Sequence, residues 1–138
     1  MIIISGRSNI KLSTRISSQL GKELFPVTIE NFNNGEIKID IKETIRNEHV
    51  IVIQTGYYNL QQNYSVNDIL IETLLLIDAI RRSNPKSISL IIPLFFYSRQ
   101  DRKDLSREPI SASVICKMFE TIGIDRILTL DLHSPQTQ

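Results

Sequence analysis

One apolar segment that ends abruptly in charge constrains the fold of this 138-residue chain more than any other feature. Residues 87–92 form a short aliphatic run, typical of a strand in a parallel sheet that helices cover on both faces. Pro93 cannot donate a backbone hydrogen bond, so we expect the strand to end there. The polar residues 97–104 then lie at the carboxyl end of the strand, where open α/β sheets bind their ligands.

This polar segment is rich in positive charge. Its four cationic side chains are Arg99, Arg102, Lys103 and Arg107. Together they are enough to hold a polyphosphate, because guanidinium and ammonium groups both bind phosphate oxygens. The interleaved Asp101 and Asp104 allow a second interpretation, in which the segment is a solvated loop that neutralises its own charge.

The other apolar runs predict an α/β fold. Residues 2–4, 50–53 and 126–130 read as further strands, and residues 27–30 and 37–41 flank an Asn-Gly pair that predicts a β-hairpin. Three helical patterns alternate with these strands, which is typical of a sheet built from β-α-β units. Phe32 precedes the hairpin turn; it could stack on a base, but core residues are more common in that position.

The helices are predicted from apolar spacing and capping residues. The first carries a stripe of apolar residues at every fourth position: Leu12, Ile16, Leu20 and Leu24. The second follows a cap at Asn67 or Asp68, and the third has Pro109 in its first turn and a core-facing stripe. That stripe consists of Ile110, Val114, Ile115, Met118, Phe119 and Ile122. The turn at residues 6–8 could bind an anion at a helix start, but an ordinary strand-to-helix turn is favoured.

The overall charge is nearly balanced, with 16 basic and 15 acidic residues. No global field would therefore attract nucleic acid or a membrane surface, and any anion site must be local. The single Cys116 excludes an internal disulfide, and we expect it to be buried. The chain lacks an apolar run near the roughly 18 residues of a membrane span. We expect a cytoplasmic protein without nucleic-acid or membrane partners.

The last predicted strand brings two further polar residues to the same edge of the sheet. Asp131 and His133 are two positions apart, so their side chains point the same way in extended chain. A carboxylate and an imidazole placed there could hold Mg²⁺, directly or through its waters, beside a phosphate chain bound by arginines.

Several of these segments, in this order, resemble one enzyme family. The matching runs are Tyr97-Ser98-Arg99-Gln100-Asp101-Arg102-Lys103-Asp104, Ser106-Arg107, Pro109-Ile110-Ser111-Ala112 and Asp131-Leu132-His133. They are similar to ribose-phosphate pyrophosphokinases, which transfer the diphosphoryl group of ATP to the 1-hydroxyl of ribose 5-phosphate. The resemblance implies a phosphoribosyltransferase-like parallel sheet with flanking helices and a β-hairpin. It also implies Mg²⁺ as cofactor, with phosphate as an activator.

The resemblance assigns roles to individual residues. The ATP-binding set is Phe32, Asn34, Glu36, Arg99, Gln100, Asp101, Arg102, Lys103 and Asp104, the first three reaching adenine, typically in a neighbouring subunit's site. The metal-binding residues are Asp131 and His133, and His133 is also the catalytic residue. The residues matched to a regulatory phosphate or nucleotide site are Arg46, Ser106 and Arg107.

The resemblance also sets expectations for domains and assembly. Members of the family consist of two similar α/β halves, so residues 1–138 are expected to be the amino-terminal domain, without the half that binds ribose 5-phosphate. We expect this polypeptide alone to lack synthetase activity and to self-associate into dimers and, as in the family, hexamers.

Two other functions stay open at this point. The first is a non-catalytic subunit associated with true synthetases, although the intact Arg-Gln-Asp-Arg run at residues 99–102 favours the enzyme. The second is a nucleic-acid-binding module that uses the basic loop, which the near-neutral charge of the chain disfavours.

Overall fold

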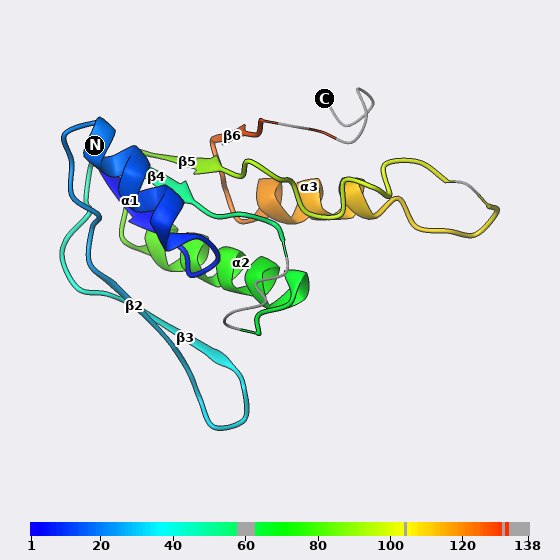
Figure 1. Cartoon of the computed structure of the whole chain (residues 1–138), viewed down its shortest axis with the longest axis horizontal. Helices are drawn as coiled ribbons and strands as arrows, with labels where there is room; N and C mark the ends of the chain where they lie inside the picture. Colours follow the sequence, from blue (N-terminus) through cyan, green and yellow to red (C-terminus); the bar gives the residue numbers. More distant parts are fainter. Residues whose placement is uncertain (58–62, 104, 131, 133–138) are drawn as a thin grey trace.

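The computed structural model describes residues 1–57, 63–103, 105–130 and 132. Its elements follow the order β1 (Ile2–Ser5), α1 (Ile10–Gln19), β2 (Val27–Asn31), β3 (Ile37–Ile41), β4 (His49–Ile53), α2 (Val66–Arg82), β5 (Ser87–Ile91), α3 (Ser111–Thr121) and β6 (Arg126–Leu128). The predicted α/β class is confirmed, because strands and helices alternate along the described residues as expected (Figure 1).

Four strands form one parallel sheet in the order β1-β4-β5-β6. Val52 lies opposite Ile4 on one side and Leu90 on the other, and Leu90 is in turn opposite Ile127. Because the strands are parallel, their carboxyl ends all lie along one edge of the sheet. The segments that follow β1, β4, β5 and β6 therefore begin at this common edge.

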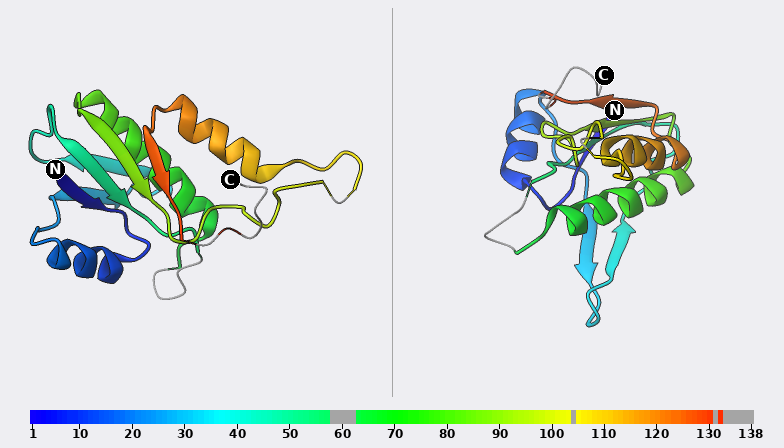
Figure 2. Two further views of the ribbon diagram at one scale, coloured as in Figure 1. Left: turned by 90° about the horizontal axis from the view of Figure 1, so that it is seen from above. Right: turned by 90° about the vertical axis from the view of Figure 1, so that its right-hand side faces the viewer.

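The helices cover the sheet unequally. Helices α2 and α3 lie on one face, whereas α1 lies against β1 on the other (Figure 2). Ile88 and Leu90 point to the α2 side and are fully buried, but Ser89 and Ile91 are only half-buried. The expectation that this strand is buried on both faces is therefore wrong, because on the second face the only described helix is α1, which lies against β1.

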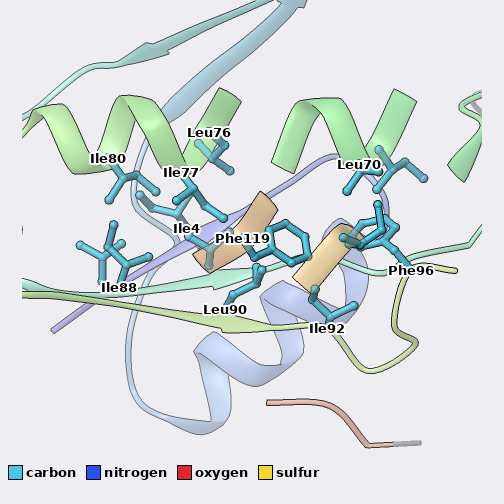
Figure 3. Close-up of a cluster of buried hydrophobic side chains, with 14 of the residues drawn as sticks. Ile4, Leu70, Leu76, Ile77, Ile80, Ile88, Leu90, Ile92, Phe96 and Phe119 are labelled. Atoms are coloured by element: carbon cyan, nitrogen blue, oxygen red, sulfur yellow. The ribbon is translucent and has the colours of Figure 1, made fainter. Parts of the chain in front are cut away.

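The core lies between the sheet and α2. Phe119 from α3 and Phe96 from the segment after β5 are both fully buried, and their ring centroids are 6.1 Å apart (Figure 3). Ile77 and Ile80 reach them from α2, and Leu90 from β5. This core fixes the point at which the chain leaves β5, since Phe96 immediately precedes the charged segment.

Two helix predictions need correction. The cap of helix α2 is Ser65, earlier than either predicted residue: Ser65 accepts from the Asp68 backbone N–H at 3.1 Å, while Asp68 accepts from the Ser65 N–H at 2.8 Å. Helix α1 buries Ser13 and Ser17 rather than a leucine stripe, because it lies close to β1, where Ser5 donates to Ser13 at 2.7 Å. Leu20 follows the end of the helix and is 52% exposed.

Helix α3 also differs from the prediction. It begins at Ser111, so Pro109 precedes the helix rather than occupying its first turn. The side chains that it buries are Ala112, Ile115 and Phe119, whereas Val114 is half-exposed. Gly123 follows the last turn with φ +86°, the left-handed conformation that ends many helices.

The predicted hairpin is confirmed as strands β2 and β3, which pair antiparallel outside the main sheet. It projects away from the body of the molecule (Figure 1). Ile29 and Ile39 pack on the core near its base, and its far end is exposed.

Among the described residues, no helix is both long and apolar enough to cross a bilayer.

Candidate functional site

Polar residues after β1 and β4 form a closed group with a carboxylate of α2, here called the Arg7 cluster: Arg7, Ser8, Gln54 and Glu72. Glu72 on α2 is only 2% exposed and accepts from the Arg7 backbone N–H at 2.8 Å and from the Arg7 Nε at 2.7 Å. Gln54 Nε2 donates to the same carboxylate at 3.0 Å, and Gln54 Oε1 accepts from the Ser8 backbone N–H at 3.1 Å.

The Arg7 cluster decides between the two interpretations of residues 6–8. The backbone N–H groups of Arg7 and Ser8 are both bound by side chains of the protein, so a carboxylate of the chain already occupies the anion position. A β-carbon on Gly6 would collide with the side-chain amide of Gln54, which would have to move from its hydrogen-bonded position. The ordinary turn is confirmed, and this turn is not a phosphate site.

The segment after β5, here called the 97–109 loop, is open by contrast. It projects from the body beside α3 (Figure 1). Its base is fixed by Gln100, whose backbone N–H donates to the Tyr97 carbonyl at 3.0 Å, while its side-chain oxygen accepts from Ser111 at 2.5 Å. Tyr97 has φ +53°, an unusual conformation for a bulky residue, and such backbone strain is concentrated at functional sites.

The cations of the 97–109 loop face solvent. Arg99, Lys103 and Arg107 are exposed, and within the described part of the chain none of them forms an ion pair. Arg102 is also exposed, and Asp101 is half-buried. Three of the four cations therefore form no ion pair with described residues. Asp104 lies outside the described residues.

The far end of the hairpin forms a second exposed surface, here called the hairpin tip, residues 32–36. Phe32, Asn33, Asn34 and Glu36 line an open pocket of about 380 Å³. The turn is held by Gly35, which donates to the Phe32 carbonyl at 2.9 Å with φ +90°, a conformation that favours glycine. Phe32 is 52% exposed, so the prediction of a core residue is wrong. The hairpin extends beyond the body, and a ring at its tip has no core to enter.

The structure does not bring the two expected halves of the ATP set together within one chain. The hairpin tip and the 97–109 loop project from different sides of the molecule (Figures 1 and 2). The pocket at the tip is lined only by hairpin residues. Within one chain the two surfaces therefore point in different directions.

The residues expected to bind a regulatory ligand are also separated. Arg46 is exposed and comes just before β4, at the amino end of the sheet, where its backbone N–H contacts Thr44 Oγ1 at 3.4 Å. Ser106 and Arg107 are exposed in the 97–109 loop, which follows the carboxyl end of β5. These positions lie at opposite ends of parallel strands, so one chain does not bring them together.

The expected metal site lies beyond what the structure describes, because Asp131 and His133 are outside the described residues. Strand β6 runs next to the segment that follows β5, since the Ile92 N–H donates to the Leu128 carbonyl at 2.8 Å. Within the described ranges, no group of three or more His, Cys, Asp or Glu side chains could hold a metal. The only support for Mg²⁺ at this edge is therefore the chemistry of the two donor groups, a carboxylate and an imidazole.

Sequence reasoning missed the Arg7 cluster and its neighbours Asn31 and Tyr64. One signal was available: Glu72 lies between Ile69 and Leu76 on the buried stripe of α2, where a carboxylate needs a partner. The partner itself could not be found by spacing, because Arg7 is 65 residues away in the chain.

Cys116 is half-buried rather than fully buried, and this burial raises the pKa of its thiol.

The fold and its exposed strand-end cations define an α/β domain suited to binding a phosphorylated ligand. Residues 1–123 match the family model described as the N-terminal domain of ribose phosphate pyrophosphokinase. The chain therefore belongs to the ribose-phosphate pyrophosphokinase family and corresponds to the amino-terminal domain of its members.

Individual relatives agree with this assignment. Ribose-phosphate pyrophosphokinase 1 of Streptococcus pneumoniae is 39% identical over 131 residues, which are 95% of this chain and 39% of the relative. The enzyme of the same name from Streptococcus pyogenes is 40% identical over the same shares. The crystal structure of phosphoribosylpyrophosphate synthetase from Mycobacterium smegmatis matches with a TM-score of 0.91 at 34% identity, over 99% of this chain and 44% of that one. The chain spans about two fifths of the length of these curated relatives, 39%.

Proposed function

We propose that this chain is the ATP-binding, amino-terminal part of an enzyme that makes phosphoribosyl diphosphate for nucleotide biosynthesis. In this reaction the 1-hydroxyl oxygen of ribose 5-phosphate attacks the β-phosphorus of ATP. The bond between the β-phosphorus and the oxygen bridging to the α-phosphate breaks, AMP leaves, and the hydroxyl proton is released. The domain boundary is part of the proposal: residues 1–138 supply the nucleotide side of the site, and ribose 5-phosphate binds elsewhere in the full enzyme.

The observation that carries this proposal is the open, cationic 97–109 loop at the carboxyl edge of a parallel sheet. Arg99, Lys103 and Arg107 are exposed and form no ion pair with described residues, so they are available for phosphate oxygens. Diphosphoryl transfer needs mainly positioning and neutralisation of charge, which arginines and lysines provide. Gln100 and the loop base fix where these cations stand relative to α3.

We propose further that the nucleotide binds between two copies of the chain. Phe32, Asn34 and Glu36 of one copy would contact the adenine, and the 97–109 loop of another copy would bind the phosphates. The separation of the two surfaces in Figure 1 supports this arrangement, since the tip offers the exposed ring of Phe32 but no cation, and the cations for phosphate lie in the 97–109 loop. Self-association into dimers, and from dimers into hexamers, follows as part of the proposal.

Asp131 and His133 are proposed to hold Mg²⁺, with His133 also serving the reacting phosphates. Carboxylate oxygen is a donor that Mg²⁺ prefers, and the metal would neutralise the charge of the diphosphate. Arg46, Ser106 and Arg107 are proposed to bind a regulatory phosphate across two copies, because one copy keeps them apart. A cytoplasmic location completes the proposal, as expected for an enzyme of nucleotide biosynthesis.

The first test is the affinity of the 138-residue chain for ATP with Mg²⁺, measured by isothermal titration calorimetry. We expect Arg99→Ala to weaken binding at least about tenfold, since a charge-assisted hydrogen bond contributes roughly 1.5–3 kcal/mol. Arg15→Ala is the matched control, because Arg15 is an exposed arginine of α1, outside the 97–109 loop. Absence of ATP binding by the parent chain, or equal losses in both variants, would contradict the proposal.

The catalytic part needs a second measurement. In the native polypeptide, whatever its length, AMP release that depends on ribose 5-phosphate should be lost in Arg99→Ala and kept in Arg15→Ala. A native protein that binds ATP but never releases AMP would instead be a non-catalytic associated subunit.

A further inference from the structure

Arg7 connects three separate parts of the molecule. Its Nε donates to Glu72 of α2 at 2.7 Å, and its Nη1 donates to Asn31 Oδ1 at 2.7 Å and to the Tyr64 hydroxyl at 2.9 Å. The guanidinium also lies over the Tyr64 ring, 4.5 Å from its centroid, as in a cation–π contact. The Arg7 side chain is 15% exposed; its contacts with Glu72 and Tyr64 are partly buried, whereas its contact with Asn31 lies at the surface.

The anchor of this arrangement is the buried carboxylate of Glu72. A buried charge is tolerated only when it is paired and hydrogen-bonded, and here both oxygens of Glu72 accept from Arg7. Because Nε is committed to Glu72, the planar guanidinium can present Nη1 in only one direction. That direction leads to Asn31, the last residue of β2.

The contact between Arg7 and Asn31 has a special place in the hairpin. Within the described residues, it is the only hydrogen bond between residues 27–42 and the rest of the chain. Hydrophobic packing by Val27, Ile29, Ile39 and Ile41 holds the base of the hairpin. At the outer end, where the strands become exposed, the Arg7–Asn31 bond is the directional contact with the body.

The side chain of Asn31 links Arg7 to the hairpin tip. Its Oδ1 accepts from Arg7, and its Nδ2 donates to the Gly35 carbonyl at 3.2 Å. Both ends of one planar amide are therefore used, one toward the body and the other toward the turn. The turn is the segment that presents the Phe32 ring together with Asn34 and Glu36.

We propose that Arg7 is a positioning residue that holds the hairpin tip at the angle at which Phe32 meets a purine nucleotide. This inference rests on the proposed role of the tip in binding ATP. Arg7 does not touch the nucleotide itself; it acts through Asn31. The turn at residues 6–8 therefore serves the site by orienting the hairpin through Arg7, and not by binding phosphate.

The test begins without any nucleotide, so that it does not depend on the proposed function. The chain has no tryptophan, so Phe32→Trp places a single fluorescent reporter on the tip. In this background Asn31→Ala removes both the contact with Arg7 and the bond to the Gly35 carbonyl, but leaves the Arg7–Glu72 pair in place. We expect a larger amplitude of local motion in the time-resolved anisotropy of the indole. Glu30→Ala is the matched control, because Glu30 is an exposed neighbour on β2 with no bond to the body among the described residues.

A second variant, Arg7→Lys, separates positioning from folding. Lysine keeps a positive charge beside Glu72, so the chain should fold, but its ammonium lacks the planar fork that reaches Glu72 and Asn31 together. We expect Arg7→Lys to keep a cooperative unfolding transition, with a lower denaturant midpoint than the parent, and to show the tip motion of Asn31→Ala. Tip motion equal to that of Glu30→Ala in both variants would overturn the inference.

The last step adds ATP with Mg²⁺ to the same samples and follows quenching of the indole. We expect Asn31→Ala and Arg7→Lys to bind ATP about threefold to tenfold more weakly than Glu30→Ala, the effect of losing one positioned hydrogen bond. Increased tip motion with unchanged ATP affinity would overturn the link to the nucleotide. In a chain with the native Phe32, an unchanged affinity after Phe32→Ala would instead remove the tip from the proposed ATP site, which is a failure of the proposed function.

Discussion

The Arg7 cluster and the 97–109 loop begin at the same edge of one parallel sheet, yet they are built in opposite ways. In the Arg7 cluster an arginine meets a buried carboxylate of the same chain, and its neighbours complete the hydrogen bonds. In the 97–109 loop Arg99, Lys103 and Arg107 stand exposed with no ion pair among described residues. Position at a strand end therefore does not make a cation available to a ligand. A cation at a strand end is available to a ligand only if the fold does not already pair it with a carboxylate of the same chain.

The largest expected effect tests the closed side of this comparison. Glu72→Ala should lower the free energy of unfolding by about 3 kcal/mol, because it leaves Arg7 without its partner in a largely buried position. Glu43→Ala is the control, since Glu43 is exposed between β3 and β4. Arg99→Ala should change stability by no more than about 0.5 kcal/mol, as exposed substitutions usually do.

Urea unfolding followed by circular dichroism measures all three variants. Similar urea midpoints for Glu72→Ala and Arg99→Ala would contradict the contrast between the Arg7 cluster and the 97–109 loop. In that case the Arg7 cluster would not be a stabilising unit, or the 97–109 loop would carry structural contacts of its own.

A smaller effect tests whether the hairpin tip binds the base of ATP while the 97–109 loop binds its phosphates. Phe32→Ala should weaken ATP binding by about tenfold, the scale of stacking one base on an aromatic ring. It should leave binding of inorganic tripolyphosphate unchanged, because that ligand has phosphates but no base. Arg99→Ala should weaken both ligands. Titration calorimetry measures each pair, and an equal loss for tripolyphosphate in Phe32→Ala would show that the hairpin tip does not read the base.

The fold could be predicted from sequence because its signals are local. The aliphatic run of residues 87–92, the Asn-Gly turn before Ile37 and the alternation of strands with helices each identify an element from a few neighbouring residues. The ends of elements are harder to predict. The sequence favours Asn67 or Asp68 as the cap of α2, whereas Ser65 and Asp68 act together, and a pattern of single residues does not reveal such a reciprocal pair.

The site was only partly predictable for a physical reason. The cations of the 97–109 loop are close together in the chain, so their combined charge is evident from the sequence alone. The exposure of Phe32 is not, because it depends on how far the hairpin projects beyond the core (Figure 1). The partner of Arg7 is hidden for a similar reason: Glu72 approaches it only after β1 and α2 have packed in the same fold.

The smallest expected effect compares two carboxylates on one helix, one turn apart. Glu72 is buried in the Arg7 cluster, whereas Asp68 is exposed at the start of α2. Hydrogen bonds from the side chain and then the backbone N–H of Ser65 hold the pKa of Asp68 below its usual value, and the charge of Arg7 adds to this. A folded-state pKa that is lowered means that the ionised carboxylate stabilises the fold above the unfolded-state pKa, near 3.8. This contribution is lost as the pH falls through the lower, folded-state value.

Asp68→Asn should therefore cost about 0.5 kcal/mol near neutral pH, a modest amount because the group is exposed and screened by solvent. The difference between this variant and the parent should shrink as the pH falls below the usual range of a carboxyl group, where both side chains are neutral. Urea midpoints taken across this range measure it, with Glu43→Gln as an exposed control outside the helix. A constant difference at all pH values would mean that the Asp68 charge contributes nothing. The cap would then act through hydrogen bonds that an uncharged side chain also makes, and of these two carboxylates only the buried Glu72 would use its charge to hold α2 in place.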